Sequence, residues 1–101
     1  MAGAVIVTGA SRGIGAAVAR LAGAHGYPVA VNFAREGAAA QEVVRAIAAA
    51  GGRAVAIQGD VAREEDVMRL FETAERELGP IEGLVNNAGD VDGEHTCQGV
   101  R

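Results

Sequence analysis

A glycine-rich segment near the start of the chain carries the residues best suited to bind a ligand. The segment reads TGASRGIG over residues 8–15 and lies between an apolar run at 4–7 and a stretch with helical periodicity. Glycines let the backbone turn tightly and approach a phosphate closely, and the N-terminus of a following helix offers free N–H donors and the positive end of the helix dipole. In the order strand, glycine turn, helix, this chemistry predicts a pyrophosphate site of the dinucleotide type.

Reactive side chains are scarce elsewhere. The chain has one cysteine (Cys97), one tyrosine (Tyr27), one serine (Ser11) and no lysine. Cys97 is interpreted as an incidental thiol because no basic residue is placed to activate it, and a lone cysteine is typical of a reducing, cytoplasmic compartment. His95 stands among acidic residues, but these groups lie too close together in sequence to predict a metal site.

The charge and hydropathy of the chain limit the kinds of partner that it is expected to bind. The formal net charge is −4, which argues against nucleic acid or an anionic membrane as the main partner. The chain does not begin with the pattern of a signal peptide, and no apolar run approaches the roughly 20 residues that cross a bilayer. Half of the residues are apolar, so the chain has enough apolar side chains for one small domain.

The apolar pattern alternates between strand and helix. Strands are predicted at 4–8, 29–33, 54–57 and 81–85, and helices at 13–25, 36–50 and 63–78. This alternation predicts an α/β fold with a parallel sheet and helices on both faces. The first helix is predicted to place four apolar side chains on one face, namely Ile14, Val18, Leu21 and Ala22.

Three motifs together resemble the short-chain dehydrogenase/reductase family. The first is the spacing Gly9-x-x-x-Gly13-x-Gly15, the second is G-D-V at 59–61 after the third strand, and the third is N-N-A-G at 86–89 after the fourth. The resemblance covers the N-terminal half of the family and residues 4–89 of this chain. It implies a partial Rossmann-like, doubly wound parallel sheet with strand order 3-2-1-4, which binds a nicotinamide dinucleotide at its carboxyl edge.

The resemblance also assigns residues to parts of that cofactor. These are Gly9, Ser11, Gly13, Ile14 and Gly15 for the pyrophosphate, Asp60 and Val61 for the adenine, and Asn87, Ala88 and Gly89 for the ribose. Taken alone, Asp60 could equally be a helix cap or a solvated loop charge. Taken alone, N-N-A-G could be a turn after a strand.

The end of the second strand bears on the choice between NADP(H) and NAD(H). A carboxylate there would hydrogen-bond the ribose 2′-hydroxyl of NAD and repel a 2′-phosphate, but residues 32–35 read N-F-A-R. Arg12 and Arg35 could together hold a 2′-phosphate, and Asn32 is counted with the cofactor-binding residues. The sequence therefore favours NADP(H), with NAD(H) as the alternative.

No catalytic residues are assigned. The family's chemistry uses a Tyr-x-x-x-Lys pair with a serine, whereas Tyr27 is followed four residues later by Val31 and the sequence has no lysine. Residues 1–89 are expected to form a cofactor-binding half-domain and 90–101 a disordered tail, which motivates the hypothesis of a truncated or frame-shifted product.

Three functions stay open at this point. The first is an NADP(H)-dependent oxidoreductase by family, inactive as this chain alone. The second is a non-catalytic nucleotide-binding module. The third is a vestigial fragment that associates with itself or with a relative, because its fourth strand would expose an unpaired edge.

Overall fold

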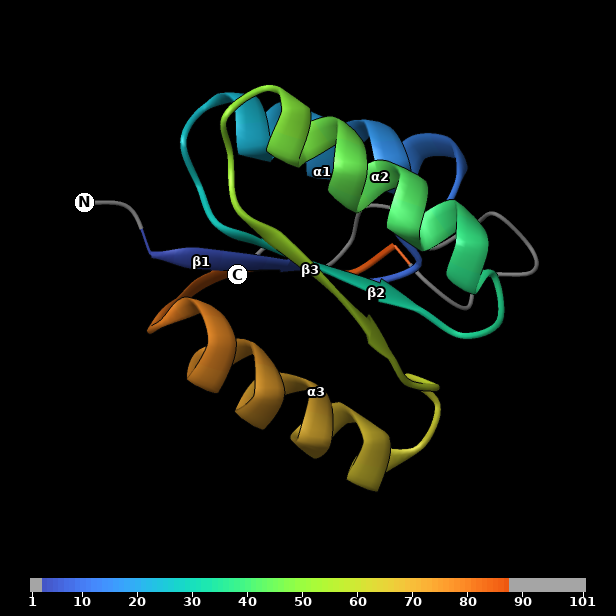
Figure 1. The fold of residues 1–101 in the computed structure, drawn as a ribbon. Coiled ribbons are helices and arrows are strands. Elements are labelled where there is room, and N and C mark those ends of the chain that lie inside the picture. The colour runs from blue at the N-terminus through green and yellow to red at the C-terminus, as the bar shows by residue number, and fades with distance from the viewer. Residues whose placement is uncertain (1–2, 88–101) are drawn as a thin grey trace.

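A four-stranded parallel sheet lies at the centre of the computed structural model, which describes residues 3–87 (Figure 1). Strands β1 (Ala4–Val7), β2 (Val29–Phe33), β3 (Ala54–Gln58) and β4 (Ile81–Val85) alternate with helices α1 (Gly13–Ala24), α2 (Gly37–Ala49) and α3 (Glu64–Leu78). The order across the sheet is β3-β2-β1-β4, with every neighbouring pair parallel. The predicted Rossmann-like α/β fold and strand order are therefore confirmed. The predicted tail at 90–101 lies outside the described residues.

Helices cover both faces of this sheet and create two cores. Helices α1 and α2 lie on one face and α3 on the other (Figure 1). Val7, Val29 and Val31 point into the first core, whereas Ile6 and Ala30 meet Leu70 of α3 in the second. Neighbouring residues of one strand therefore serve opposite cores, as the two-residue period of a strand requires.

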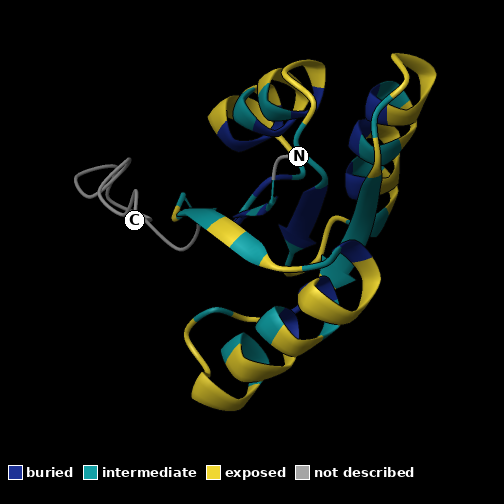
Figure 2. Ribbon diagram, turned by 90° about the vertical axis from the view of Figure 1, so that its left-hand side faces the viewer, coloured by how far each residue is buried: buried dark blue, intermediate teal, exposed yellow. Residues whose placement is uncertain are grey.

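The central and edge strands differ in burial, as Figure 2 shows. Three of the four residues of β1 are buried, while no residue of β4 is. Among the described strands, β4 pairs with β1 alone. The glycine-rich segment thus follows a mostly buried central strand, which gives it a rigid support.

Helix α1 buries only part of the apolar face that the sequence pattern indicates, since Val18 and Ala22 pack against the first core but Ile14 and Leu21 do not. Its buried residues are small, namely Gly15, Ala16, Ala19 and Gly23. Ile14 and Leu21 are both 60% exposed. The reason is close packing: a Cβ at Gly23 would lie 2.8 Å from Ile47 Cγ2 of α2, so only small residues fit between α1, α2 and the sheet.

The ends of α1 and α3 follow ordinary capping chemistry. His25 Nδ1 lies 2.9 Å from the Leu21 carbonyl oxygen, which places the imidazole at the carbonyl end of α1. Helix α3 begins with three acidic residues, Glu64–Asp66, at the positive end of its dipole. It ends at Gly79, whose φ of +99° favours glycine.

Candidate functional site

The glycine loop, residues 8–15, turns from the end of β1 into α1. Gly9 and Gly13 adopt φ values of +59° and +63°, which other residues reach only with strain. The Ala10 N–H donates to the Asn32 carbonyl oxygen at 2.8 Å, so the loop is attached to the end of β2. Helix α1 begins at Gly13, and its first amides face the carboxyl edge of the sheet, where a phosphate could accept their hydrogen bonds.

Gly15 marks the closest approach within this loop. A Cβ at this position would overlap the Gly9 carbonyl oxygen and would lie 2.7 Å from Asn87 Nδ2 and 3.0 Å from Ala10 Cα. Two of these three neighbours are backbone atoms, which cannot swing away. Glycine is therefore required here by contact, whereas at Gly13 a Cβ would meet nothing within 4 Å and the requirement comes from φ alone.

Hydrogen bonds join the glycine loop to the end of β4. The Thr8 hydroxyl accepts the Asn87 N–H at 2.8 Å, and it lies 3.1 Å from Asn86 Oδ1 and 3.3 Å from the Val85 carbonyl oxygen. Asn87 Nδ2 donates to the Gly9 carbonyl oxygen at 3.2 Å. The two asparagines therefore fasten the ends of β1 and β4 together, and we refer to these bonds as the Thr8–Asn87 clamp.

The loop after β3 is held by α3. Asp60 accepts the Ala62 N–H at 2.9 Å through Oδ1, while its own N–H donates to Asp66 Oδ2 at 2.8 Å. The pKa of Asp66 is lowered, first because its carboxylate accepts the Asp60 N–H and further because Arg69 lies 2.9 Å away, although partial burial opposes this shift. Arg63, not Asp60, is the N-cap residue of α3, so Asp60 stands as an exposed charge within the loop, and it also lines the pocket described next.

A pocket of about 270 Å³ brings several of the predicted residues together. Its lining comes from the glycine loop, the loop after β2 and the loop after β3, and consists of Gly9, Ser11, Asn32, Ala34, Arg35, Glu36, Gly59, Asp60 and Val61. Arg12 and Gly13 line a separate groove between α1 and α2. Ile14 is mostly exposed, and Ala88 and Gly89 lie outside the described residues.

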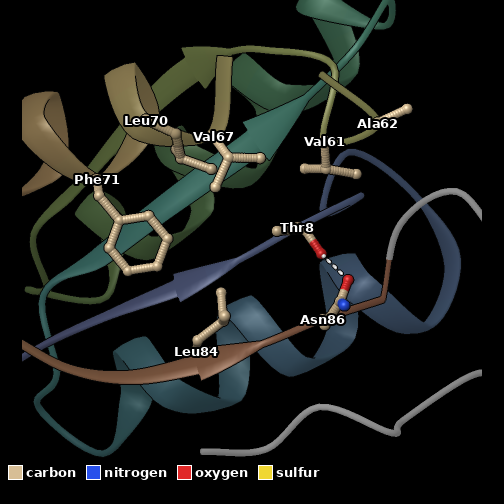
Figure 3. A pocket seen from close by; sticks show the side chains of 8 residues that line it. All are labelled: Thr8, Val61, Ala62, Val67, Leu70, Phe71, Leu84 and Asn86. Carbon is tan, nitrogen blue, oxygen red and sulfur yellow. Dashed lines mark hydrogen bonds between the residues drawn. The ribbon is translucent and has the colours of Figure 1, made fainter. Parts of the chain in front are cut away.

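A second hollow, of about 340 Å³, lies on the α3 side of β1 and β4. Figure 3 shows Leu70, Phe71 and Leu84 around it, with Thr8 and Asn86 joined by a hydrogen bond at one side. None of its lining side chains carries a charge, so its polar groups are limited to the Thr8 hydroxyl and the Asn86 amide. Within residues 3–87, no three His, Cys, Asp or Glu residues gather to hold a metal ion.

Two contributors to the site were not identified from the sequence. In the sequence, Asp66 is only one of several acidic residues in the first turn of a helix, and this pattern does not indicate its hydrogen bond to Asp60. Gln58, at the end of β3, donates to the Ala34 carbonyl oxygen at 3.1 Å and so holds the loop that carries Arg35. Its place after an apolar strand is the only signal that could have indicated this role.

The fold and the position of the site define a class: a doubly wound parallel α/β protein whose glycine loop opens at the carboxyl edge of the sheet. The family model for short chain dehydrogenases matches residues 3–98. The chain therefore belongs to the short-chain dehydrogenase family. The match runs past Gly89, and the domain boundary at that residue stays a prediction.

Individual relatives agree with this assignment. An uncharacterised oxidoreductase of Methylorubrum extorquens is 48% identical over 84 residues, which are 83% of this chain and 34% of the relative. A 3beta-hydroxysteroid dehydrogenase of Eggerthella lenta is 48% identical over 85 residues, 84% of this chain and 33% of the relative. The chain thus spans about a third of the length of these relatives.

Solved structures show the same fold. A dehydrogenase/reductase from Sinorhizobium meliloti has a TM-score of 0.84 and 41% identity, covering 88% of this chain and 36% of that chain. A dehydrogenase from Burkholderia cenocepacia with bound NADP has a TM-score of 0.83 and 30% identity, covering 89% of this chain and 35% of that chain.

No helix among residues 3–87 is long and apolar enough to cross a membrane.

Substitution of Gly15 tests the packing of the loop. We expect Gly15→Ala to destabilise the fold by about 1–3 kcal/mol, because the added methyl meets backbone atoms that cannot move aside. Denaturant unfolding measures this loss. Gly26→Ala is the control: it has a φ of +93° and free space around it, so strain alone should cost about 1 kcal/mol. An alanine at 15 that is no more costly than one at 26 would contradict the close contact.

The lowered pKa of Asp66 predicts a dependence of stability on pH. Because the native carboxylate holds its proton more weakly than the unfolded one, its contribution is complete above the ordinary aspartate pKa of about 3.9 and is lost as the pH falls through the lower native value. In Asp66→Asn this part of the acid sensitivity should disappear. Thermal unfolding from about pH 6 to about pH 3 measures it, with Glu72→Gln on the same helix as control. Curves for Asp66→Asn that run parallel to the wild type would refute the prediction.

Proposed function

We propose that this chain binds NADP(H) at the carboxyl edge of its sheet, as the cofactor-binding part of an oxidoreductase that transfers hydride between the cofactor and a carbonyl or alcohol. The observation that carries the proposal is the glycine loop, with positive φ at Gly9 and Gly13 and with α1 starting directly behind it. The bound cofactor would supply the hydride. The chain's own residues would bind and orient it.

The cofactor's parts can be matched to the site. The pyrophosphate would lie on the glycine loop near Ser11, and the adenine would lie near Asp60 and Val61, which line the same pocket. Asn87, with Ala88 and Gly89 following it, would border the nicotinamide ribose. The clamp supports this assignment because it holds Asn87 beside Gly9.

Electrostatics support NADP(H) over NAD(H). Arg35 is exposed in the pocket one residue beyond Ala34, while the last residue of β2, Phe33, carries no carboxylate. Guanidinium groups bind phosphates in a two-pronged geometry, so Arg35 in the pocket suits a 2′-phosphate, and Arg12 would join it from the neighbouring groove, which shares Ser11 with the pocket. Glu36 also lines the pocket and would oppose this preference. The NADP bound to the Burkholderia cenocepacia relative supports the same choice.

We do not propose that this chain alone turns over a substrate. Tyr27 precedes β2 and therefore lies at the amino edge of the sheet, opposite the glycine loop. The sequence offers no lysine to pair with a tyrosine. We therefore propose cofactor binding without turnover for these residues.

The single cysteine supports a cytoplasmic location.

The proposal predicts a pattern of affinities. NADP(H) should bind more tightly than NAD(H), and Arg35→Ala and Arg12→Ala should each weaken NADP(H) by about tenfold while leaving NAD(H) nearly unchanged. Glu36→Gln should strengthen NADP(H). Fluorescence titration with NADPH and with NADH measures the dissociation constants of the wild type and of the three variants.

Arg76→Ala is the matched control, because Arg76 lies in the last turn of α3 on the other side of the sheet. It should bind both cofactors as the wild type does. Tighter binding of NADH than of NADPH by the wild type would overturn the NADP(H) assignment, and no binding of either would overturn the proposed function.

A second candidate rests on the edge of the sheet. Among the described residues, β4 has β1 as its only strand neighbour, and a shallow hollow beside it is lined by Phe71, Ile81 and Leu84. An open strand edge is a template for pairing with another chain. In this alternative the chain associates with itself or with a relative and binds no cofactor.

Association can be tested with a lysine on β4. A Cβ at Gly83 would lie 3.8 Å from its nearest neighbour, Val5 Cγ2, so Gly83→Lys should fit the fold. Lysine is a common guard on natural sheet edges. Sedimentation should then show a wild-type dimer that Gly83→Lys converts to a monomer, while Met68→Lys on α3 leaves it intact. A wild-type monomer at all concentrations would exclude this alternative.

A further inference from the structure

The side-chain amide of Asn32 lies where three segments of the candidate site meet. Asn32 is on β2 and is 1% exposed. Its Oδ1 accepts the Gly9 N–H at 3.3 Å. Its Nδ2 donates to the carbonyl oxygens of Ile57 and Gly59, both at 3.2 Å. One amide therefore joins the glycine loop, the end of β3 and the start of the loop that carries Asp60.

These bonds use the full donor capacity of the side chain. A carboxamide nitrogen has two hydrogens, and both are donated to backbone carbonyls. Burial also keeps the amide away from a ligand that lies in the pocket. The Asn32 side chain therefore has no N–H left for a ribose hydroxyl or a phosphate, although Asn32 is among the residues that line the pocket.

Backbone bonds near Asn32 reinforce the same three-way junction. The Asn32 carbonyl oxygen accepts the Ala10 N–H at 2.8 Å, and the Phe33 carbonyl oxygen accepts the Gly59 N–H at 2.9 Å. The two loops that face each other across the pocket are thus both bonded to the end of β2. The side chain adds the link that the backbone of β2 cannot make, from Gly9 to the Gly59 carbonyl.

We infer that Asn32 is a positioning residue that sets the separation of the phosphate-binding glycine loop from the adenine-side loop at 59–61, without touching the cofactor. This inference rests on the proposed NADP(H) binding. It assigns to Asn32 a different role from Arg35, which would contact the 2′-phosphate directly. The two roles differ in their effect on the choice of cofactor.

A positioning role predicts equal losses for the two cofactors. Asn32→Ala leaves Gly9 N–H and two carbonyls without their side-chain partner, so the loops lose their common support. We expect the dissociation constants of NADPH and NADH to rise by the same factor, about tenfold or more. A residue that bound the ribose or its phosphate would instead change the ratio of the two constants.

Val31→Ala is the matched control in this titration. Val31 precedes Asn32 on the same strand and is equally buried, but it points into the core between the sheet and helices α1 and α2. Its truncation should lower stability while leaving both dissociation constants unchanged at a temperature where each variant is folded. The inference is overturned if Val31→Ala weakens binding as much, or if Asn32→Ala alters the NADPH to NADH ratio.

A second measurement keeps the inference testable if Asn32→Ala does not fold or if the wild type binds no cofactor. In the wild type without cofactor, the Gly9 amide proton should exchange slowly with solvent because it is bonded to Asn32 Oδ1. In the milder Asn32→Ser it should exchange about tenfold faster or more, while amides of β1 keep their rates. Unchanged Gly9 exchange refutes the positioning role, whereas absent cofactor binding with faster exchange refutes only the proposed function.

Discussion

The candidate site depends on the close approach of three groups: the Gly9 carbonyl oxygen, the α-carbon of Gly15 and the side-chain nitrogen Nδ2 of Asn87. No side chain fits between them. The glycine loop can therefore fold back on α1 and meet the end of β4 only because residue 15 has no Cβ. Once this contact is made, Thr8 reaches the Asn87 backbone, and the ends of β1 and β4 are fixed relative to each other.

The same preference for small residues governs α1 as a whole. Its buried residues are all alanines and glycines, and this lets the helix axis lie close to the strands that carry the loop. A helix that buried Leu21 would have to stand farther away. The N-terminus of α1 would then be displaced from the carboxyl edge, where its amides are useful. The close packing of these small side chains thus helps to place the N-terminus of α1 at the candidate site.

The sequence predicted the elements to within a residue or so at each end, and the bounds of β2 and β4 exactly as observed. Strand and helix periods are strong in this chain, and glycines or prolines end most elements. It predicted the face that α1 buries only in part, because hydrophobicity alone favours Ile14 and Leu21 over alanines. It also did not indicate that the Asn32 side chain is buried, since a polar residue at the end of a strand gives the same pattern whether it points outward or inward. Only the three-dimensional register of β2 between β1 and β3 shows that this amide is buried.

The clamp has a consequence for how the chain acquires its site. Thr8 and Asn87 are 79 residues apart in sequence, so their hydrogen bond spans nearly all of the described chain. Contacts of such separation require a large loop to close before they contribute to stability. During synthesis, β1, α1 and β2 leave the ribosome long before β4 exists. The emerging chain therefore carries a glycine loop that lacks its partner, and the pocket edge near Asn87 can be completed only when translation has passed that residue.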